Sequence, residues 1–423
     1  MKKSRLSVLL IFMMFCVLFC VACGKSEVGT EPVPGSSNVT DTGTGAEGSD
    51  AVPETTEAPQ ATMEPEEGLT GKTYDPGVFL MTGENVKLLG RTWLNNDIRW
   101  LSFSASGVEF QFTGKSCSFN LRADSMYSNK NHQARYAIYV DGELVIDEMM
   151  DKGIKEVPVL QADAVEEHVI RFVKLSETSD SSLGLQYITC DADAKIQPTE
   201  EKDLLIEFVG DSITCGYGVD GELGDVYLTG NEDATKAYAF LTAQKLDADW
   251  SLVSQSGYGI ISGYTNNGKK QEKQALPLYY DKVGNSYGTA GGVNPSEKEW
   301  KFNRLPDVVV INLGTNDNSY TKNDATKKEE YVQGYVAFLE KVREKNPDAE
   351  IVCTLGVMGQ ELCPQIEKAV EQFSTEKNDT KVHYVKLDVQ AYENGWAVDY
   401  HPTAASHEHA AEQMSKAISE ILK

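Results

Sequence analysis

The chain has 423 residues, of which 41% are hydrophobic and 24% charged, and its formal net charge is −25. That length is enough for two ordinary domains with appendages. The acidic excess argues against binding to a nucleic acid, which needs clustered Lys and Arg, and against electrostatic attraction to anionic lipid. A neutral partner such as a sugar polymer is compatible with this charge.

The first 23 residues have the pattern of a secretory signal sequence. A basic start, MKKSR, precedes an apolar run from Leu6 to Ala22, and Cys23 follows at the end of the tripeptide VAC. We therefore expect residues 1–23 to be a lipoprotein signal peptide with Cys23 as the lipidated residue. The alternative is an uncleaved membrane anchor, for which the apolar run is short. Both interpretations predict an extracytoplasmic protein that is anchored to the membrane at the cell surface.

Residues 24–72 are rich in Ser, Thr, Gly, Pro and Glu and have almost no large apolar side chains. Ten acidic residues stand against two lysines in this segment. Such a composition cannot bury a core, so the segment is predicted to be a disordered acidic linker. Its expected role is to hold the folded part of the chain away from the membrane.

Residues 73–197 show only β-strand signals. Short runs alternate between apolar and polar residues, as in Val108–Phe112 and His168–Val173, and the dipeptide Asp141-Gly142 joins two such runs. Asp-Gly between alternating segments is a strong signal for a β-hairpin. Several short strands within about 120 residues predict an all-β domain, either a β-sandwich or a jelly roll.

Strands and helices alternate in residues 198–423. Apolar runs typical of strands buried on both faces are followed by segments with helical signals. The expected strands are 204–209, 250–253, 306–313, 350–355 and 382–387, and the expected helices are 234–246, 327–345, 364–376 and 403–422. This alternation predicts an α/β domain in which a parallel sheet lies between two helical layers, a flavodoxin-like arrangement. Ligands of such sheets bind beyond the carboxyl ends of the strands.

No motif in the chain predicts a metal or a cofactor. The five cysteines after Cys23 include no CxxC pair, and His407-Glu408-His409 lacks the HExxH spacing of a zinc site. The segment Gly216–Gly221 matches GxGxxG, but it does not directly follow a strand, as a dinucleotide-binding loop does.

Polar loops follow the expected strands at four places. Ser212 comes just after the first strand, and the later loops are Ser256–Gly259, Gly314–Asp317 and Asp399–Pro402. A serine in this position can be a helix cap and nothing more. All four loops, however, fall at the same edge of the parallel sheet, where they assemble a serine, an accessible glycine, an asparagine and a histidine with a nearby aspartate. These are the groups that acyl transfer requires.

The four loops resemble the sequence blocks of SGNH (GDSL-type) hydrolases, through GDS at 210–212, Gly257, GTND at 314–317 and DYHP at 399–402. The chain is more closely similar to carbohydrate esterase family 2, through LGR at 89–91, the run PDVVVINLGTND and the final aspartate-aromatic-His-Pro block. The likeness covers roughly residues 86–421. It implies an N-terminal jelly roll, a C-terminal SGNH domain and the removal of acetyl groups from plant polysaccharides.

The resemblance implies a role for each block. Ser212 would be the nucleophile, His401 the general base and Asp399 the carboxylate that orients the imidazole. The oxyanion hole would consist of the backbone N–H groups of Ser212 and Gly257 and the side-chain amide of Asn316. The spacing Asp399-x-His401 is shorter than the Asp-x-x-His of most SGNH enzymes, so a backbone carbonyl is the alternative group that orients His401.

Three aromatic residues in or beside these loops, Tyr258, Trp396 and Tyr400, are expected to contact sugar rings. The sequence thus predicts a carboxylic ester hydrolase, a serine esterase that removes O-acetyl groups from a polysaccharide such as xylan or glucomannan through an acetyl-enzyme. Two alternatives remain. One is another SGNH esterase, lipase or thioesterase, and the other is a carbohydrate-binding surface lipoprotein with a vestigial hydrolase site.

Overall fold

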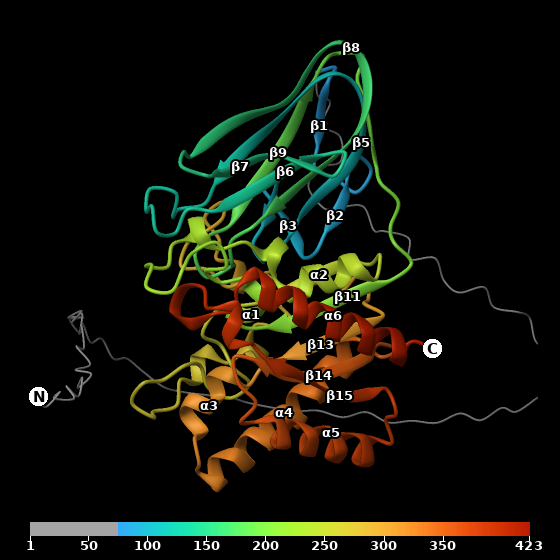
Figure 1. The fold of residues 1–423 in the computed structure, drawn as a ribbon. Coiled ribbons are helices and arrows are strands. Elements are labelled where there is room, and N and C mark those ends of the chain that lie inside the picture. Colours follow the sequence, from blue (N-terminus) through green and yellow to red (C-terminus); the bar gives the residue numbers. More distant parts are fainter. Residues whose placement is uncertain (1–74) are drawn as a thin grey trace, which may run out of the picture. The chain divides into compact units, whose positions relative to one another are not determined.

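The computed structural model describes residues 75–423, which belong to one compact unit and form two β-sheets (Figure 1). The expected signal peptide of residues 1–23 and the expected linker of residues 24–72 lie outside the described residues. The first sheet is antiparallel and has ten strands, and the second is parallel and has five. The predicted fold class, an all-β part followed by an α/β part, is confirmed.

The antiparallel sheet is built on two long strands, β5 and β8, which pair along most of their length. The strand order is β3-β4-β9-β5-β8-β6-β7, with β1 paired to β9 and with β2 and β10 paired to β5. The strands are β1 (Val78–Leu80), β2 (Lys87–Leu89), β3 (Thr92–Asn95), β4 (Ile98–Leu101), β5 (Gly107–Ala123), β6 (Arg135–Val140), β7 (Glu143–Met149), β8 (Ile154–Lys174), β9 (Leu183–Cys190) and β10 (Lys195–Pro198).

Aromatic side chains fill the core of this sheet. The ring of Phe172 stacks on Tyr136 with ring centroids 5.1 Å apart, and Phe119 packs on Phe172 at the same centroid distance. All three side chains are fully buried. The predicted hairpin is confirmed between β6 and β7, where Asp141 and Gly142 have φ of 52° and 87°, the left-handed values that a tight two-residue turn requires.

The parallel sheet has the strand order β12-β11-β13-β14-β15. Its strands are β11 (Leu205–Gly210), β12 (Asp249–Ser254), β13 (Val308–Asn312), β14 (Glu350–Val357) and β15 (Val382–Val389). The helices are α1 (Ser212–Cys215), α2 (Tyr238–Lys245), α3 (Thr315–Thr321), α4 (Ala325–Lys345), α5 (Cys363–Lys377) and α6 (Ala404–Ile421). Short 3₁₀ helices span Thr229–Asn231, Ala234–Lys236, Glu272–Gln274, Leu276–Leu278, Pro295–Glu297, Tyr392–Asn394 and Val398–Tyr400.

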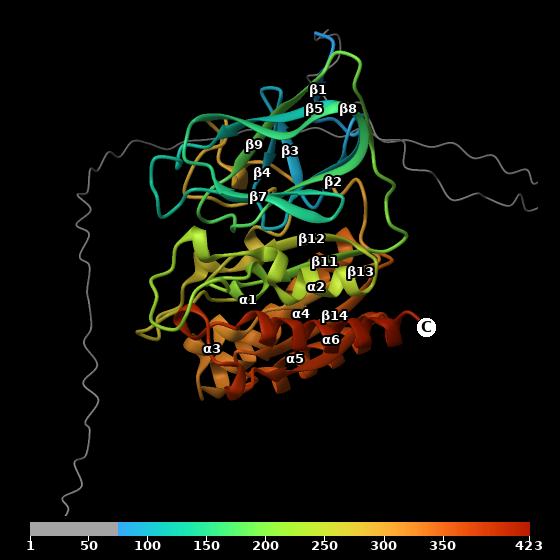
Figure 2. The same cartoon turned by 45° about the horizontal axis from the view of Figure 1, so that its top comes forward.

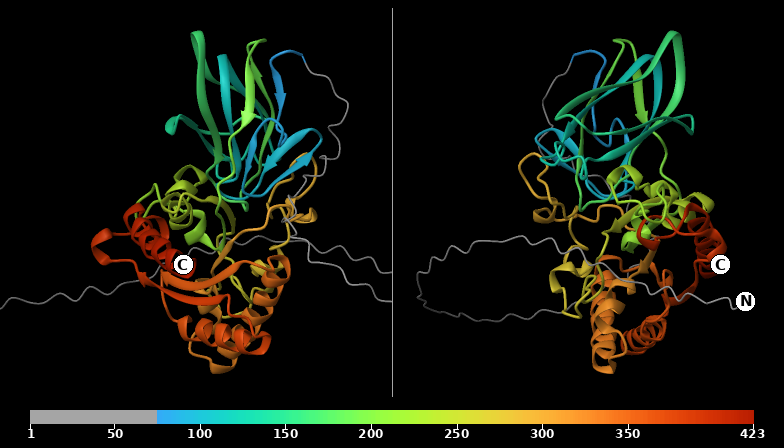
Figure 3. Two further views of the ribbon diagram at one scale, coloured as in Figure 1. Left: turned by 90° about the vertical axis from the view of Figure 1, so that its right-hand side faces the viewer. Right: turned by 60° about the vertical axis from the view of Figure 1, so that its left-hand side comes forward.

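The helices cover both faces of this sheet, because successive side chains of each buried strand point to opposite sides. Ile206 and Phe208 of β11 pack against α2 and α6, whereas Val209 belongs to the core formed with α4 and α5. Figure 3 shows the two helical layers on the two sides of the sheet. Helices α4 and α6 begin at side-chain caps, Asp324 and Thr403, as helix starts commonly do.

The two sheets share a hydrophobic core. Leu89, Ala105 and Val173 of the antiparallel part belong to the same buried cluster as Phe208 and Trp250 of the parallel part. The indole Nε1 of Trp250 also donates a hydrogen bond to the carbonyl of Ala105 at 2.8 Å. In Figure 2 the antiparallel strands lie directly against β11 and β12. The two parts are therefore packed together rather than linked loosely.

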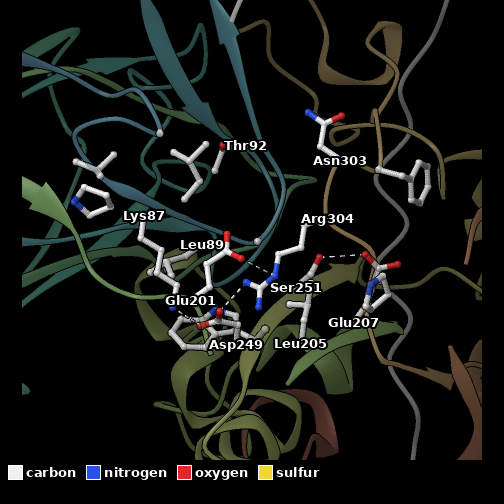
Figure 4. Close-up of a pocket in the computed structure, with 18 of the residues that line it drawn as sticks. Lys87, Leu89, Thr92, Glu201, Leu205, Glu207, Asp249, Ser251, Asn303 and Arg304 are labelled. Atoms are coloured by element: carbon white, nitrogen blue, oxygen red, sulfur yellow. Dashed lines mark hydrogen bonds and ion pairs between the residues drawn. The ribbon is translucent and has the colours of Figure 1, made fainter. Parts of the chain in front are cut away.

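A cavity of about 310 Å³ lies between the two parts, at the amino ends of β11 and β12 (Figure 4). Its charged side chains form ion pairs, among them Arg304 with Asp249 at 2.6 Å and Arg304 with Glu201 at 3.3 Å.

None of the helices within residues 75–423 combines the length and apolar character needed to cross a membrane.

Candidate active site

Ser212 stands at a tight turn from a buried strand into a short helix. Strand β11 is buried throughout and ends at Gly210, and Asp211 caps helix α1 through a 3.0 Å hydrogen bond from the Ile213 N–H to its carboxylate. A Cβ at position 210 would lie 2.0 Å from Thr214 Oγ1, so only glycine fits there. Ser212 is thereby fixed as the first residue of α1, at the carboxyl edge of the sheet.

His401 meets Ser212 across the edge of the sheet. Its Nε2 lies 2.8 Å from Ser212 Oγ, and its Nδ1 lies 3.1 Å from the carbonyl oxygen of Val398. A carbonyl only accepts, so Nδ1 carries the proton and Nε2 is left to accept from the serine hydroxyl. This is the tautomer that a general base needs.

Asp399 does not take the place that the resemblance implied. The Nδ1 atom of His401 faces the Val398 carbonyl, which is the alternative that the sequence left open. Asp399 and Tyr400 both have left-handed φ, 51° and 64°. This tight turn brings the carbonyl to the imidazole and turns the exposed Asp399 carboxylate outward, where it accepts a 3.0 Å hydrogen bond from Tyr217. Strain of this kind is common at functional sites.

Tyr217 supports the imidazole from one side. Its ring lies 4.3 Å from the His401 ring between centroids, with an angle of 34° between the planes. On its other face Tyr227 stacks at 3.9 Å and 6°. An aromatic face favours a cation next to it, so Tyr217 stabilises the imidazolium that forms when His401 takes a proton. No spacing rule in the sequence points to this contact.

The electrostatic environment keeps His401 neutral. Burial lowers its pKa from 6.5 to about 4, while the Val398 carbonyl and the negative charge of Asp399 act in the opposite direction. Burial disfavours the charged form of a histidine. The imidazole is therefore ready to accept a proton at neutral and mildly acidic pH.

Two backbone N–H groups are available in the loops that follow the paired strands β11 and β12. Among the described residues, the N–H groups of Ser212 and Gly257 donate to no other protein group. Gly257 has a φ of 81°, and a Cβ placed on it would meet nothing within 4 Å, so the space in front of it is open. Donors held in this way can bind the negative oxygen that develops during acyl transfer.

Both hydrogens of the Asn316 amide are already donated. Its Nδ2 donates to the Tyr258 carbonyl at 2.8 Å and to the Asp211 carboxylate at 3.2 Å. Both partners are acceptors, which fixes the amide orientation. To act as a third donor, Asn316 must break its longer hydrogen bond, the one to Asp211, and direct that N–H toward the substrate oxygen.

Two buried carboxyl groups hold the loops of the site. Asp317 accepts hydrogen bonds from the backbone N–H groups of Ile260, Ile261 and Ser262 at 2.8–3.1 Å. Burial raises the pKa of Asp317 to about 6 and that of Asp211 to about 7. Neither side chain reaches Ser212 Oγ or His401, so both anchor loops.

The aromatic residues that were expected to contact sugar rings differ in how far their rings are exposed. Tyr258 is only 9% exposed and packs edge-on against Tyr279, so its ring does not offer a free face. Tyr400 is 61% exposed and packs edge-on against Trp396. Tyr392, which the sequence analysis does not single out, extends this cluster and is 79% exposed. The open rings lie beside His401 in the sequence and offer flat apolar surface.

One group of potential metal ligands occurs within residues 75–423. Glu177, Cys215 and Glu232 are buried, and one ligand atom from each lies within 4.8 Å of the others. Glu177 already accepts hydrogen bonds from the Ser256 N–H and the Ser179 hydroxyl. This group does not include Ser212 or His401.

Comparison with known families assigns both parts of the chain. Residues 208–409 match the GDSL-like Lipase/Acylhydrolase family, and residues 88–199 match the Carbohydrate esterase 2 N-terminal family. The two matches follow one another along the chain, the first over most of the antiparallel part and the second over most of the α/β part. Ser212, His401, Gly257 and Asn316 all lie within residues 208–409.

Several known proteins are similar to this chain along most of its length. The cellulase/esterase CelE of Acetivibrio thermocellus is 30% identical over 330 residues, which are 76% of this chain and 37% of CelE. An acetylxylan esterase / glucomannan deacetylase of Cellvibrio japonicus is 29% identical over 286 residues, which are 64% of this chain and 73% of that protein. A family two carbohydrate esterase from Clostridium thermocellum, solved with cellohexaose, has a TM-score of 0.68 and 26% identity, covering 80% of this chain and 99% of that one.

Proposed function

We propose that the protein is a serine esterase that removes O-acetyl groups from a polysaccharide through an acetyl-enzyme on Ser212. The observation that carries this proposal is the 2.8 Å contact between Ser212 Oγ and His401 Nε2, at the edge of the sheet where two backbone N–H groups have no acceptor within residues 75–423. A nucleophile, its base and an oxyanion site are the minimal set for acyl transfer.

The proposed reaction follows from this geometry. Ser212 Oγ attacks the acetyl carbonyl carbon while its proton passes to His401 Nε2, and the N–H groups of Ser212 and Gly257 bind the developing oxyanion. The bond to the sugar oxygen then breaks, and that oxygen takes the proton from Nε2. A water molecule, deprotonated by His401, attacks the acetylated serine, which releases acetate and restores the Ser212 hydroxyl.

The aromatic residues that precede His401 and the names of related proteins support a sugar polymer as the carrier of the acetyl group. Tyr392, Trp396 and Tyr400 present aromatic surface next to His401 along the chain. The names of the relatives, acetylxylan esterase / glucomannan deacetylase among them, support the same substrate class. The family two structure with cellohexaose supports binding of a glycan chain by this pair of domains.

Acetate release tests this proposal. Acetylated xylan and acetylated glucomannan should both be assayed, beside a chromogenic acetyl ester and its long-chain homologue. We expect release from the acetyl substrates and a loss of at least about 10⁴-fold in Ser212→Ala. Faster hydrolysis of the long-chain ester would favour a lipase or thioesterase. Glycan binding without any turnover would favour a vestigial site.

We further propose that the protein is a lipoprotein of the cell surface, attached through Cys23. The basic start and the apolar run that precede this cysteine in the sequence support the proposal. Metabolic labelling with a fatty acid should mark the full chain but not its Cys23→Ala variant, and that variant should leave the membrane fraction. An unlabelled full chain that stays in the membrane fraction would instead favour an uncleaved anchor.

A further inference from the structure

A buried polar segment of the antiparallel part reaches the active-site loops of the α/β part. Residues 175–182 connect β8 to β9 and are all buried. The main chain of this segment forms hydrogen bonds with the second domain. The carbonyl of Leu175 accepts from the Ala234 N–H at 3.1 Å, and the carbonyl of Ser179 accepts from the Tyr287 N–H at 2.9 Å.

Glu177 is the centre of this contact. Its side chain is 2% exposed, and its Oε2 accepts a 2.8 Å hydrogen bond from the backbone N–H of Ser256. The Sγ of Cys215 lies 3.8 Å from the same oxygen. Ser256 directly precedes Gly257, and Cys215 is the last residue of the helix that Ser212 begins. One carboxylate thus touches both segments that supply the backbone donors of the oxyanion site.

Glu177 is itself held on several sides. Its own N–H donates to Glu232 at 2.9 Å, and its carbonyl accepts from the ammonium group of buried Lys174 at 3.0 Å. Ser179 donates its hydroxyl to Glu177 Oε2 at 3.0 Å. A side chain with this many fixed partners has little freedom to move.

Hydrogen bonds link the neighbouring acids to the aromatic rings beside His401. The Tyr227 hydroxyl lies 2.8 Å from Glu232 and 2.9 Å from Asp180, but it has only one hydrogen to donate. This one hydroxyl thus links the two carboxyl groups. Burial raises the pKa of Glu232 well above its ordinary value. Tyr227 in turn stacks on Tyr217, the ring beside His401.

We propose that Glu177 is a positioning residue that sets the spacing between the Ser212 and Gly257 N–H groups, so that the first domain completes the catalytic site of the second. This inference rests on the proposed esterase function and deepens it. Glu177 touches neither the substrate nor the reacting atoms, and it acts through the Ser256 main chain. A displacement of about 1 Å in a catalytic group can cost about 10²-fold in rate.

The test compares substitutions of Glu177 in the full chain with a chromogenic acetyl ester. In Glu177→Ala the acceptor for the Ser256 N–H is lost, and we expect kcat to fall about 10²-fold with KM nearly unchanged. In Glu177→Gln the amide oxygen can still accept that hydrogen bond, and we expect kcat to recover most of this loss. Glu177→Asp keeps the charge but withdraws the carboxylate, and it should behave like Glu177→Ala.

Glu207→Gln is the matched control, since Glu207 is also a buried acid at the contact between the two domains. It pairs with Arg91 at the opposite edge of the sheet, at 3.0 Å. We expect this variant to lower the melting temperature and leave kcat unchanged. If Glu177→Ala and Glu177→Asp both keep the parent kcat, or if Glu207→Gln loses kcat to the same extent as they do, the positioning role is wrong. A parent enzyme without activity on any acetyl ester would contradict the proposed function instead.

Discussion

The two edges of the parallel sheet are occupied in opposite ways. At the amino edge, the 310 Å³ cavity between the domains is lined by charged groups that pair with one another, such as Arg304 with Asp249. At the carboxyl edge, the N–H groups of Ser212 and Gly257 have no acceptor among the described residues. Paired charges stabilise the contact between domains, whereas free donors are ready for a ligand. The size of a cavity therefore does not locate the chemistry in this protein.

The same contrast explains how the site maintains its shape. A donor left without an acceptor costs about 1–3 kcal/mol when it is buried. The carboxyl edge tolerates such donors because other hydrogen bonds hold the same loops in place. The most important are the three that backbone N–H groups donate to Asp317. Substitutions at the two edges should accordingly separate turnover from stability.

The largest of the remaining effects on turnover is expected from Asn316→Ala. This change removes the amide that we expect to leave Asp211 and donate to the oxyanion, and the loss of such a donor typically lowers kcat by about 10²–10³-fold, or about 2.7–4 kcal/mol of transition-state stabilisation. Steady-state kinetics with an acetyl ester measures it. An unchanged kcat would show that the two backbone donors suffice and that Asn316 serves only to hold Asp211 and the Tyr258 carbonyl.

The pH dependence should show an unusually low acid limit. His401 must be neutral to accept a proton, and its pKa is lowered to about 4, so activity is expected to fall only as the pH drops through about 4. At pH 5 about 90% of the enzyme would be competent, against about 3% for a histidine with an ordinary pKa of 6.5. The profile of kcat/KM between pH 3.5 and 8 checks this. A limit near 6.5 would mean that the imidazole is less buried in solution.

A smaller effect is expected from Asp399→Ala. Because the Val398 carbonyl holds His401 Nδ1, loss of this carboxylate should lower kcat by less than about tenfold, whereas removal of an orienting aspartate from a true triad costs about 10⁴-fold. Tyr217→Phe is the partner experiment, since it breaks the same hydrogen bond and keeps the ring on His401. If the two variants lose kcat to the same extent, the role of Asp399 is limited to its hydrogen bond with Tyr217. A loss of kcat near 10⁴-fold in Asp399→Ala would instead show that Asp399 orients the imidazole.

The smallest effect on turnover is expected at the amino edge. Arg91→Met leaves the buried Glu207 carboxylate without its partner, which should lower the free energy of unfolding by about 3–5 kcal/mol while kcat stays unchanged. Denaturant unfolding measures the first quantity and ester hydrolysis the second. Arg304→Met is the control, with a smaller loss, because Arg304 is partly exposed and Asp249 keeps its ion pair with Lys87. A fall in kcat in Arg91→Met would show that the two edges are coupled.

Local patterns in the sequence predict most of the fold and the Ser–His pair. The run Val308–Asn312 and the Asp141-Gly142 turn each depend on neighbouring residues, so their structure follows from composition and spacing. Ser212 and His401 meet because parallel strands bring their following loops to one edge. Boundaries shift by a few residues, as at the expected helix 234–246, whose first turns are a separate 3₁₀ helix.

Contacts that depend on backbone angles or on distant segments are not predictable in this way. Asp399 and Tyr400 have left-handed φ, and this turn lets the Val398 carbonyl accept from Nδ1 of His401. A sequence motif specifies side chains and not backbone angles, so it does not predict this contact. Glu177 lies 79 residues before Ser256 and in the other domain, so no spacing rule connects them. Tyr258 lies in a polar loop, yet tertiary packing buries its ring.

The hydrophobic core that joins the two sheets limits how this protein can be rearranged. Leu89 and Val173 are buried in one cluster with Phe208 and Trp250. A chain divided after β10 would expose apolar surface on both fragments, so neither is suited to be expressed alone or transplanted onto an unrelated enzyme, as an independent sugar-binding module can be. Engineering of this scaffold therefore has to keep the two domains together.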